Sequence, residues 1–145
     1  MRSIRPDFSA LEIPWDAWSK PFWDAAAERK LLMPRCTDCG TFRWPAGPFC
    51  PKCRSQSVEW LPPGQARIYS FTVVPVRSER EDAPPQMRIP ALVEFDNAPG
   101  VRLVSSLVDA PVEEVKIGAV VDVDWIVAAN ATAPVFKLKS DAGSR

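Results

Sequence analysis

The chain has 145 residues, 46% of them hydrophobic and 25% charged, so its composition is that of a globular protein rather than a disordered one. Lys plus Arg and Asp plus Glu each number 18, and this formal net charge of zero weighs against a general nucleic-acid binder. No histidine is present, which excludes mechanisms that need a histidine base and metal sites with histidine ligands.

Two prolines divide the first thirty residues into two predicted helices. Pro14 and Pro21 each suit the first turn of a helix, because proline lacks an amide hydrogen that would be unpaired there. We therefore expect an N-terminal helical segment over 1–30, with a short helix over 14–19 and a longer one over 21–29. Aromatic residues recur along it at helical spacings: Trp15, Trp18, Phe22 and Trp23. Their side chains either anchor the helices in the core or form a docking face, since tryptophan is frequent at interface hot spots.

The four cysteines form two closely spaced pairs within residues 31–61. The pattern is Cys36-x2-Cys39, ten residues, then Cys50-x2-Cys53. Two such turns facing each other place four thiolates around one ion, which is the arrangement of a tetrahedral zinc site. Because all four ligands come from the chain, no position is left for water or substrate, and we expect the zinc to be structural. Residues 31–61 are then a zinc ribbon that folds around its metal.

Two alternatives to zinc stay open at this ribbon. Iron in a rubredoxin-like site uses the same four thiolate ligands. A redox-active thiol pair is the second, although two such pairs so close together favour a shared ion. Gly40 follows the first pair, where the backbone often needs a positive φ, and Arg54 occupies the equivalent position after the second pair. The sequence therefore predicts backbone strain at Arg54.

From residue 62 onward the pattern changes to that of a β-barrel. Short runs rich in β-branched and aromatic residues alternate with turn residues and predict five strands, over 65–76, 91–95, 101–108, 119–128 and 135–138. We expect a polar loop at 77–88, a helical turn at 110–116 and a frayed tail at 141–145. Five strands with a helical turn between the third and fourth favour a five-stranded OB-fold barrel over 62–140, although the pattern alone does not distinguish it from an SH3-like barrel.

No set of residues in the sequence combines a nucleophile, a base and an orienting group. Tyr69, the single tyrosine, falls in the first predicted barrel strand, where we expect a packing role. Asp122 and Asp124 share one face of the fourth predicted strand, and an acidic pair there is typical of a solvated surface. We therefore expect a mainly β protein, with N-terminal helices, a rubredoxin-like zinc ribbon and a barrel, that is not itself an enzyme.

Several stretches taken together resemble one known family. They are PFWDAAAERKLLMPRCTDCGTFRWPAGPFCPKC at 21–53, YSFTVV at 69–74, ALVEF at 91–95, VRLVSSLVD at 101–109 and PVFKL at 134–138. In this order they are similar to the thiolase-associated family that joins a rubredoxin-like zinc ribbon to an OB-fold, long catalogued as a domain of unknown function. The resemblance covers nearly the whole chain, and all four cysteines match the metal-ligand positions of the family. Arg54 departs from the pattern, since glycine is commoner there.

The resemblance implies an accessory protein of acyl-CoA metabolism. Members of the family partner thiolase-like enzymes, including condensing enzymes and the lipid-transfer-protein-type aldolases of sterol side-chain breakdown. Some are fused to, or complexed with, hot-dog-fold enoyl-CoA hydratases. The implied function is a non-catalytic, acyl-CoA-binding accessory subunit that works in a hetero-oligomer with such a thiolase-like enzyme.

This hypothesis assigns two sets of binding residues. The phosphates of CoA require arginine or lysine, and its adenine requires a flat partner. The first predicted barrel strand and the loop after it supply such groups: Phe71, Arg77, Arg80 and Arg88. An ordinary hydrated surface is the alternative for these arginines. The partner interface is assigned to aromatic residues of the N-terminal helices and the ribbon: Trp18, Phe22, Trp23 and Trp44.

A single-stranded nucleic-acid-binding module is the alternative function. Zinc ribbons and OB barrels both bind nucleic acid, and aromatic residues for base stacking are available. The zero net charge and the acidic pair at Asp122 and Asp124 weigh against it. No apolar run of signal-peptide or membrane-spanning length is found, and the clustered cysteines suit a metal in a reducing compartment. We therefore expect a cytoplasmic protein without membrane contact.

Overall fold

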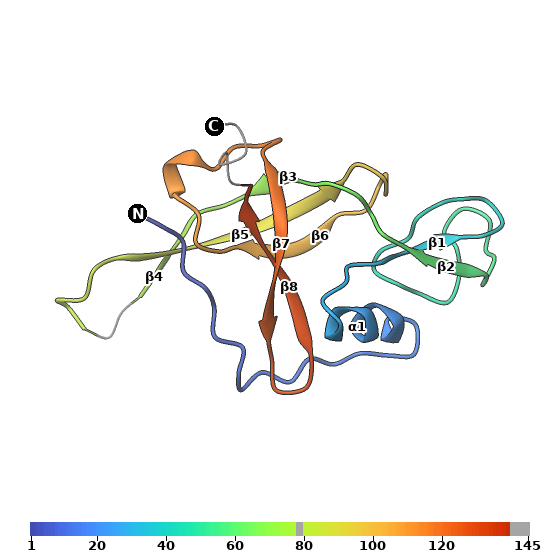
Figure 1. Ribbon diagram of the computed structural model, residues 1–145, viewed down its shortest axis with the longest axis horizontal. Coiled ribbons are helices and arrows are strands. Elements are labelled where there is room, and N and C mark those ends of the chain that lie inside the picture. The colour runs from blue at the N-terminus through green and yellow to red at the C-terminus, as the bar shows by residue number, and fades with distance from the viewer. Residues whose placement is uncertain (78–79, 140–145) are drawn as a thin grey trace.

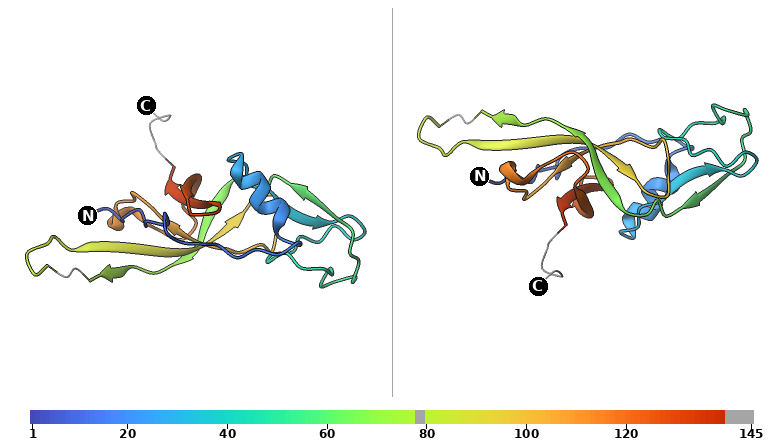
Figure 2. Two further views of the ribbon diagram at one scale, coloured as in Figure 1. Left: turned by 90° about the horizontal axis from the view of Figure 1, so that it is seen from below. Right: turned by 90° about the horizontal axis from the view of Figure 1, so that it is seen from above.

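The computed structural model describes residues 1–77 and 80–139, which form a small ribbon and a curved sheet with one α-helix beside them (Figure 1). In chain order the helices and strands are α1 (Lys20–Ala27), β1 (Met33–Cys36), β2 (Val58–Leu61), β3 (Ala66–Phe71), β4 (Val74–Val76), β5 (Gln86–Phe95), β6 (Leu103–Leu107), the 3-10 helix η1 (Val112–Glu114), β7 (Val120–Val127) and β8 (Thr132–Leu138). The protein is therefore mainly β, as predicted. Figure 2 shows the ribbon at one end of an elongated molecule and the β4–β5 hairpin extending from the other.

The larger sheet has the strand order of an OB-fold. β3 pairs with both β5 and β7, β5 pairs with β6, and β7 pairs with β8, all antiparallel. A parallel pair between Leu107 and Phe136 joins β6 to β8, so the pairings return to the first strand. β4 is an additional edge strand on β5. Its position explains how Pro75 is accommodated, since proline has no N–H for a second neighbour.

The inner face of this sheet forms the main core. Its fully buried side chains come from five strands and include Ile68, Ile89, Leu107, Val121 and Phe136. Alternation along β5 is regular, with every second residue from Ile89 to Phe95 buried. This is the period-2 pattern of a strand that faces the core on one side only.

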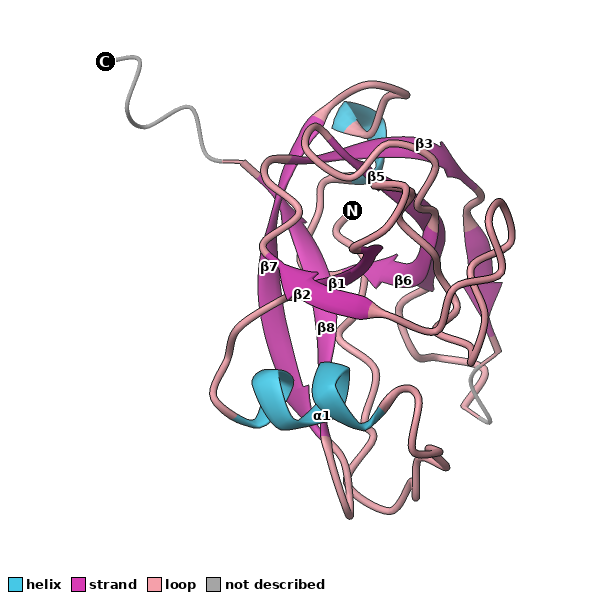
Figure 3. Ribbon diagram, turned by 90° about the vertical axis from the view of Figure 1, so that its right-hand side faces the viewer, coloured by secondary structure: helices cyan, strands magenta, loops and turns pink. Residues whose placement is uncertain are grey.

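Helix α1 packs its apolar side between the ribbon and the sheet. Phe22, Ala25 and Ala26 are buried, at the spacings that lie on one face of a helix. Its proline in the first turn is Pro21, as the sequence predicted. Seen from the ribbon end, α1 lies beside the ends of β7 and β8 (Figure 3). The helix is thus the element that joins the two β units.

The prediction of a second helix over 14–19 is wrong, because residues 17–19 form a turn instead. The amide of Ser19 donates to Asp16 Oδ1 at 2.9 Å, and the amide of Asp16 donates to Ser19 Oγ at 3.3 Å. These short-range hydrogen bonds offer the backbone an alternative to a helix, and Pro21 then starts α1 just after them. Trp15 and Trp18 stay exposed rather than anchoring a helix.

Two strand boundaries also differ from the prediction. The expected strand over 65–76 is divided into β3 and β4, with an irregular register between Ile68 and Ser70. The expected loop over 77–88 is shorter, because β5 already begins at Gln86 and pairs there with Val76. The sheet therefore has six strands, five in the OB arrangement and one appended.

The boundaries at 30/31 and 61/62 stay predictions. Residue 140 and the predicted frayed tail over 141–145 lie outside the described residues. Within the described residues, no helix is long and apolar enough to cross a membrane.

Candidate functional site

The four cysteines lie together at the tip of the ribbon, on two turns that repeat each other. All four sulfur atoms lie within 4.8 Å of one another. The Sγ atoms of Cys36 and Cys53 are 3.5 Å apart, as are those of Cys39 and Cys50. Four sulfurs bound tetrahedrally to zinc at about 2.3 Å would be roughly 3.8 Å apart. The donor set and its spacing therefore fit a zinc ion.

Backbone hydrogen bonds give the two turns the same shape. The amide of Gly40 donates to the carbonyl of Cys36 at 2.9 Å, and that of Arg54 donates to Cys50 at 2.9 Å. Gly40 and Arg54 both have positive φ, at 79° and 66°. The predicted strain at Arg54 is confirmed, because a non-glycine residue in this region costs about 1–2 kcal/mol. At Gly40 an added Cβ would also lie 2.9 Å from Arg35 Nη2.

The same turns favour thiolates at the buried cysteines. The amide of Cys39 lowers the pKa of Cys36, and the amide of Cys53 lowers the pKa of Cys50 to about 6. At Cys53 the amide of Ser55 acts in the same direction, but desolvation and the neighbouring sulfurs outweigh it and raise the pKa to about 12. Four thiols this close do not all ionise unless a cation offsets their mutual repulsion. This is the electrostatic reason for a metal at the site.

Arg43 is a buried cation that the sequence analysis did not single out. Its side chain is 6% exposed, and Nη1 donates to the carbonyl of Ser55 at 3.2 Å. Its amide donates to the carbonyl of Pro34. Arg43 thereby ties the second cysteine turn to the segment that carries the first. No local pattern distinguishes it from an exposed arginine.

A groove of about 650 Å³ lies beside the ribbon, between α1 and the sheet. Its walls come from segments far apart in the chain, and the described residues that line it include Phe8, Phe22, Trp23, Trp44, Pro45, Leu103, Val104, Pro134 and Val135. Two aromatic contacts hold the α1 side: Phe22 packs on Trp44 at 4.6 Å and on Trp23 at 4.9 Å between ring centroids. The charged residues at the groove are Arg88 and Arg102. It is therefore a mainly apolar trench whose lining includes two cationic side chains.

The two arginines differ in how they are held. The Arg102 guanidinium lies 4.1 Å from the centre of the Tyr69 ring, donates to its neighbouring carbonyl, and lies 3.8 Å from Glu94. Arg88 lies on β5 opposite Val74, and its side chain makes no hydrogen bond or ion pair with the described residues. Tyr69, expected to be a half-buried packing residue, is 45% exposed and its ring packs against the Arg102 guanidinium.

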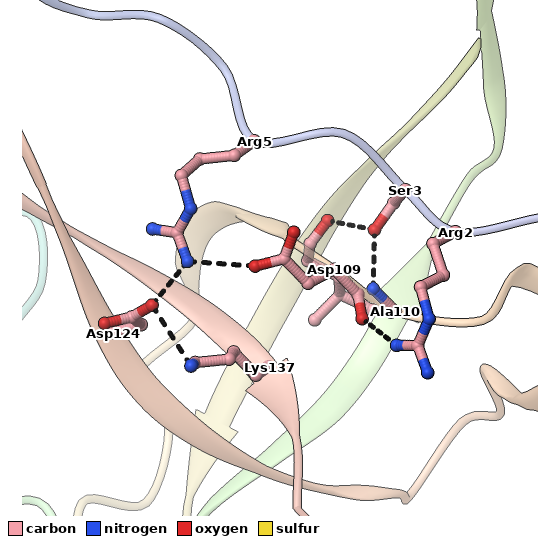
Figure 4. A network of polar contacts seen from close by, with 8 residues as sticks. Arg2, Ser3, Arg5, Asp109, Ala110, Asp124 and Lys137 are labelled. Atoms are coloured by element: carbon pink, nitrogen blue, oxygen red, sulfur yellow. Dashed lines mark hydrogen bonds and ion pairs between the residues drawn. The ribbon is translucent and has the colours of Figure 1, made fainter.

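The N-terminal segment reaches this groove because a polar network fixes it to the sheet (Figure 4). Ser3 is buried; its Oγ donates to the carbonyl of Leu107 at 2.8 Å and accepts from the amide of Ala110 at 3.0 Å. Arg5 Nη2 donates to Asp109 at 3.0 Å and to Asp124 at 2.6 Å. Phe8 then packs on a second core cluster and lines the groove.

Asp124 takes a structural part in this network. It accepts from Arg5, and Lys137 Nζ lies 3.5 Å from the same oxygen. The hydrogen bond from Arg5 holds its pKa below the ordinary value of an aspartate, against the opposing effect of burial. The two aspartates therefore differ: Asp124 is held in this network, whereas Asp122 stays exposed at the surface.

The structure brings together residues that the sequence analysis assigned to two different sites. Phe22, Trp23 and Trp44, predicted for the partner interface, and Arg88, predicted for CoA, all line the groove. Phe71 lines a smaller neighbouring cavity of about 250 Å³ that shares Pro90 and Val104 with it.

The remaining predicted residues lie elsewhere. Arg77 and Arg80 are on the outer part of the β4–β5 hairpin, and Trp18 is 48% exposed outside the groove. Arg102 and Phe8 were missed, since nothing in the local sequence shows that they meet at one place.

Comparison with known proteins separates the ribbon and the sheet into two matched regions. Residues 23–59 match the model described as the ChsH2 rubredoxin-like zinc ribbon domain, and residues 61–125 match that of the ChsH2 C-terminal OB-fold domain. A DUF35 domain-containing scaffold protein of Methanocaldococcus jannaschii is 32% identical over 69% of this chain and 71% of its own. The chain belongs to the DUF35 family. The recognised resemblance and the OB-fold with a zinc ribbon are thereby confirmed.

Three further proteins are similar to this DUF35 protein, and the share of their own length that it covers ranges from 36% to 98%. A protein of Thermomonospora curvata named "Probable enoyl-CoA hydratase alpha subunit" is 38% identical over 80% of this chain, which spans only 36% of that relative. A chain of the structure named "Ltp2-ChsH2(DUF35) aldolase" is 31% identical, with a TM-score of 0.73 over 88% of this chain and 98% of that one. A DUF35 protein of Sulfolobus solfataricus, 20% identical with a TM-score of 0.61 over 85% and 86%, shares the fold.

Proposed function

We propose that this DUF35 protein is a non-catalytic, acyl-CoA-binding accessory subunit of a thiolase-like enzyme in lipid metabolism, and that it works in the cytoplasm. The observation that carries the proposal is its likeness to a chain of the structure named "Ltp2-ChsH2(DUF35) aldolase", which extends over 98% of that chain. The names of the curated relatives, a scaffold protein and an enoyl-CoA hydratase subunit, support the same class of function. Condensation and retro-aldol cleavage both remain compatible with such a partner.

A non-catalytic role agrees with the chemistry of the chain. Histidine is absent from the sequence, so no histidine base serves the groove. The ribbon supplies four sulfur ligands, which would close the coordination sphere of a zinc ion and leave no position for substrate. In this proposal the metal folds the ribbon, and through Trp44 it holds one wall of the groove. The reacting groups belong to the partner.

The groove margin supplies the chemistry that CoA requires. Arg88 offers a guanidinium without an ion partner among the described residues, and guanidinium groups bind phosphate oxygens in bidentate geometry. Arg77 and Arg80 lie farther along the same hairpin, within the segment that Figure 2 shows projecting from the body. Phe71, in the adjoining cavity, is the candidate flat partner for adenine. We assign these four residues to the CoA head group.

The partner interface is proposed for the aromatic surface near the ribbon. Trp18 is exposed, and Trp23 and Trp44 are partly buried where they border the groove. Phe22 is 2% exposed and supports them from within. Exposed tryptophan beside a groove is typical of the anchors that dominate protein interfaces.

Titration calorimetry of the zinc-loaded chain with CoA and acetyl-CoA tests the ligand part of the proposal. The double variant Arg77→Glu/Arg88→Glu should bind CoA at least tenfold more weakly, because a lost charge-assisted hydrogen bond costs about 1.5–3 kcal/mol. Lys116→Glu, an exposed charge reversal away from the hairpin, is the matched control and should bind as the wild type does. Equal affinities for wild type and double variant would remove these arginines from the site. The isolated chain should also show no thiolase or hydratase turnover.

A further inference from the structure

Arg43 carries a buried positive charge that no acidic residue offsets within the described part of the chain. Its side chain forms no ion pair there, although the residue is only 6% exposed. By contrast, every arginine or lysine that forms an ion pair in the same residues keeps at least 36% of its side chain exposed. Burial of a guanidinium is unfavourable unless a counter-ion pairs with it. The ribbon therefore presents a cation that lacks its anion.

Two nitrogen atoms of the Arg43 guanidinium remain available. Nη1 donates to the carbonyl of Ser55 at 3.2 Å, whereas Nε and Nη2 make no hydrogen bond with the described residues. Among those residues, no side-chain nitrogen or oxygen atom is both buried and unpaired, so Nε and Nη2 keep some accessible surface. Together they form the edge of the guanidinium that can donate to both oxygens of one carboxylate.

Arg43 lines a cavity of about 400 Å³ that is separate in position from the larger groove. The ribbon supplies most of the walls, and Gly100, in the turn between β5 and β6, supplies the rest. Aromatic rings and prolines make up most of the described lining: Phe42, Trp44, Pro45, Phe49 and Pro51. Within this lining Arg43 is the one charged residue. The cavity therefore combines a single cation with apolar walls.

The charge and the walls of this cavity together select a carboxylate on an apolar stem. A neutral group would leave the Arg43 guanidinium unpaired. A phosphate dianion or a diphosphate would bring more negative charge than one guanidinium offsets, among walls that offer it few donors. A carboxylate matches the single positive charge, and the methylene groups that carry it can pack on the aromatic rings.

The surroundings of the cavity favour a protein as the source of this carboxylate. Trp44 and Pro45 also line the larger groove, so the cavity is continuous with the surface proposed for the partner. Phe49 is 58% exposed, and a free acid in the cavity would leave much of its ring in water, whereas a protein surface would cover it. We propose that the cavity around Arg43 binds an aspartate or glutamate side chain of the partner subunit, with its carboxylate on the guanidinium and neighbouring apolar groups on Phe49. The inference rests on the proposed function and adds the chemistry of one contact.

Blocked dipeptides test the carboxylate site on the isolated chain, without the partner. The zinc-loaded, nitrogen-15-labelled chain is titrated with acetyl-Phe-Glu-amide, with the neutral isostere acetyl-Phe-Gln-amide, and with benzoate as a free carboxylate. The glutamate peptide should shift the amide resonances of residues 42–51 and bind at least about tenfold more tightly than the glutamine peptide, because it gains charge-assisted hydrogen bonds. Benzoate should bind more weakly than the glutamate peptide. Tighter binding of benzoate would overturn the assignment to a protein side chain.

Two variants link this preference to the cavity. Arg43→Met removes the charge and keeps a similar volume, a change that often leaves stability unaltered at a buried charge. Gly47→Leu keeps Arg43 and fills the cavity instead, since nothing lies within 4 Å of an added Cβ there and the φ of Gly47 is outside the left-handed region. Gln56→Leu, an exposed ribbon position outside the lining, is the matched control. We expect the preference for the glutamate peptide to disappear in the first two variants and to persist in Gln56→Leu, with zinc content equal to that of the wild type in each.

Other results would overturn the inference, and they separate it from the proposed function. Equal affinities of the wild type for the two peptides would refute a carboxylate site and leave the accessory-subunit proposal intact. If Arg43→Met lost its zinc while Gly47→Leu kept the preference for glutamate, Arg43 would instead be a structural cation that offsets the cysteine thiolates.

Purification of the tagged chain from its native cells gives the second readout. The wild type should bring down a thiolase-like enzyme, and Gly47→Leu should retain at least about tenfold less of it than Gln56→Leu does. Equal retention by the two variants would refute the docking of an acidic side chain while the proposed function stands. A wild-type chain without any such enzyme would refute the proposed function itself, and with it the partner named in this inference.

Discussion

Replacing Phe22 with alanine removes the side chain that joins α1 to the ribbon. Phe22 is 2% exposed and contacts Trp23 and Trp44, with ring centroids 4.9 Å and 4.6 Å away. Truncating a buried phenylalanine costs about 3–5 kcal/mol. Since Phe22 also borders the open groove, the neighbouring rings can shift into part of the vacated space, so we expect the lower end, about 3 kcal/mol. For a chain of this size, this corresponds to a fall in melting temperature of roughly 6–12 °C.

The assay is urea unfolding of the zinc-loaded chain, followed by tryptophan fluorescence and by far-ultraviolet circular dichroism. Trp18→Ala is the control, because Trp18 is 48% exposed and its loss should change the free energy of unfolding by less than about 0.5 kcal/mol. The two probes should report one transition in the wild type if α1 couples the ribbon to the sheet. A loss below about 1 kcal/mol for Phe22→Ala would show that the ribbon and the sheet are stabilised independently of this contact.

Three further predictions follow from the metal site and the N-terminal network. Cys39→Ser should lose the bound metal, measured by elemental mass spectrometry, and destabilise the ribbon; full metal content and an unchanged melting temperature would contradict the four-thiolate site. Arg54→Gly should raise stability slightly, by about 0.5 kcal/mol, because relief of the strain at φ 66° exceeds the added entropy of the unfolded chain; a lower melting temperature would argue against strain. Arg5→Met should lower the free energy of unfolding near pH 7 by about 1 kcal/mol. Arg5 lowers the pKa of Asp124, so its contribution to stability is present above the ordinary aspartate pKa and is lost as pH falls through the lower, folded pKa. The difference in free energy of unfolding between wild type and variant should therefore begin to shrink below about pH 4 and vanish below the folded pKa. A constant difference would contradict the assignment.

The features that the sequence predicted well are those that local residues determine. The spacing of the four cysteines predicted the ribbon, and the positions after each pair predicted the positive φ at Gly40 and Arg54. Alternation of apolar residues predicted the OB strands, since a sheet with one buried face repeats every two residues. The helix over 14–19 failed for a local reason as well: hydrogen bonds between Asp16 and Ser19 favour a turn, and aromatic spacing does not detect them.

The groove could not be predicted in the same way, because it is assembled from distant segments. Phe8 is brought to it by the contacts of Ser3 and Arg5 with the far end of the chain, and the sequence carries no sign of that pairing. Arg88 and Trp44 were assigned to separate sites, since they lie on different predicted units, and the packing of α1 between those units places them together.

The most direct test of the accessory-subunit proposal is to purify the tagged chain from cells that naturally produce it, at physiological salt, and to identify the proteins that accompany it. Mass spectrometry should find a thiolase-like enzyme in near-stoichiometric amount, and light scattering of the same fraction should give the mass of a hetero-oligomer. A Cys39→Ser variant provides the control, because a ribbon without its metal should no longer hold the interface. A wild-type chain that purifies alone, or with nucleic acid in place of an enzyme, would contradict the proposal.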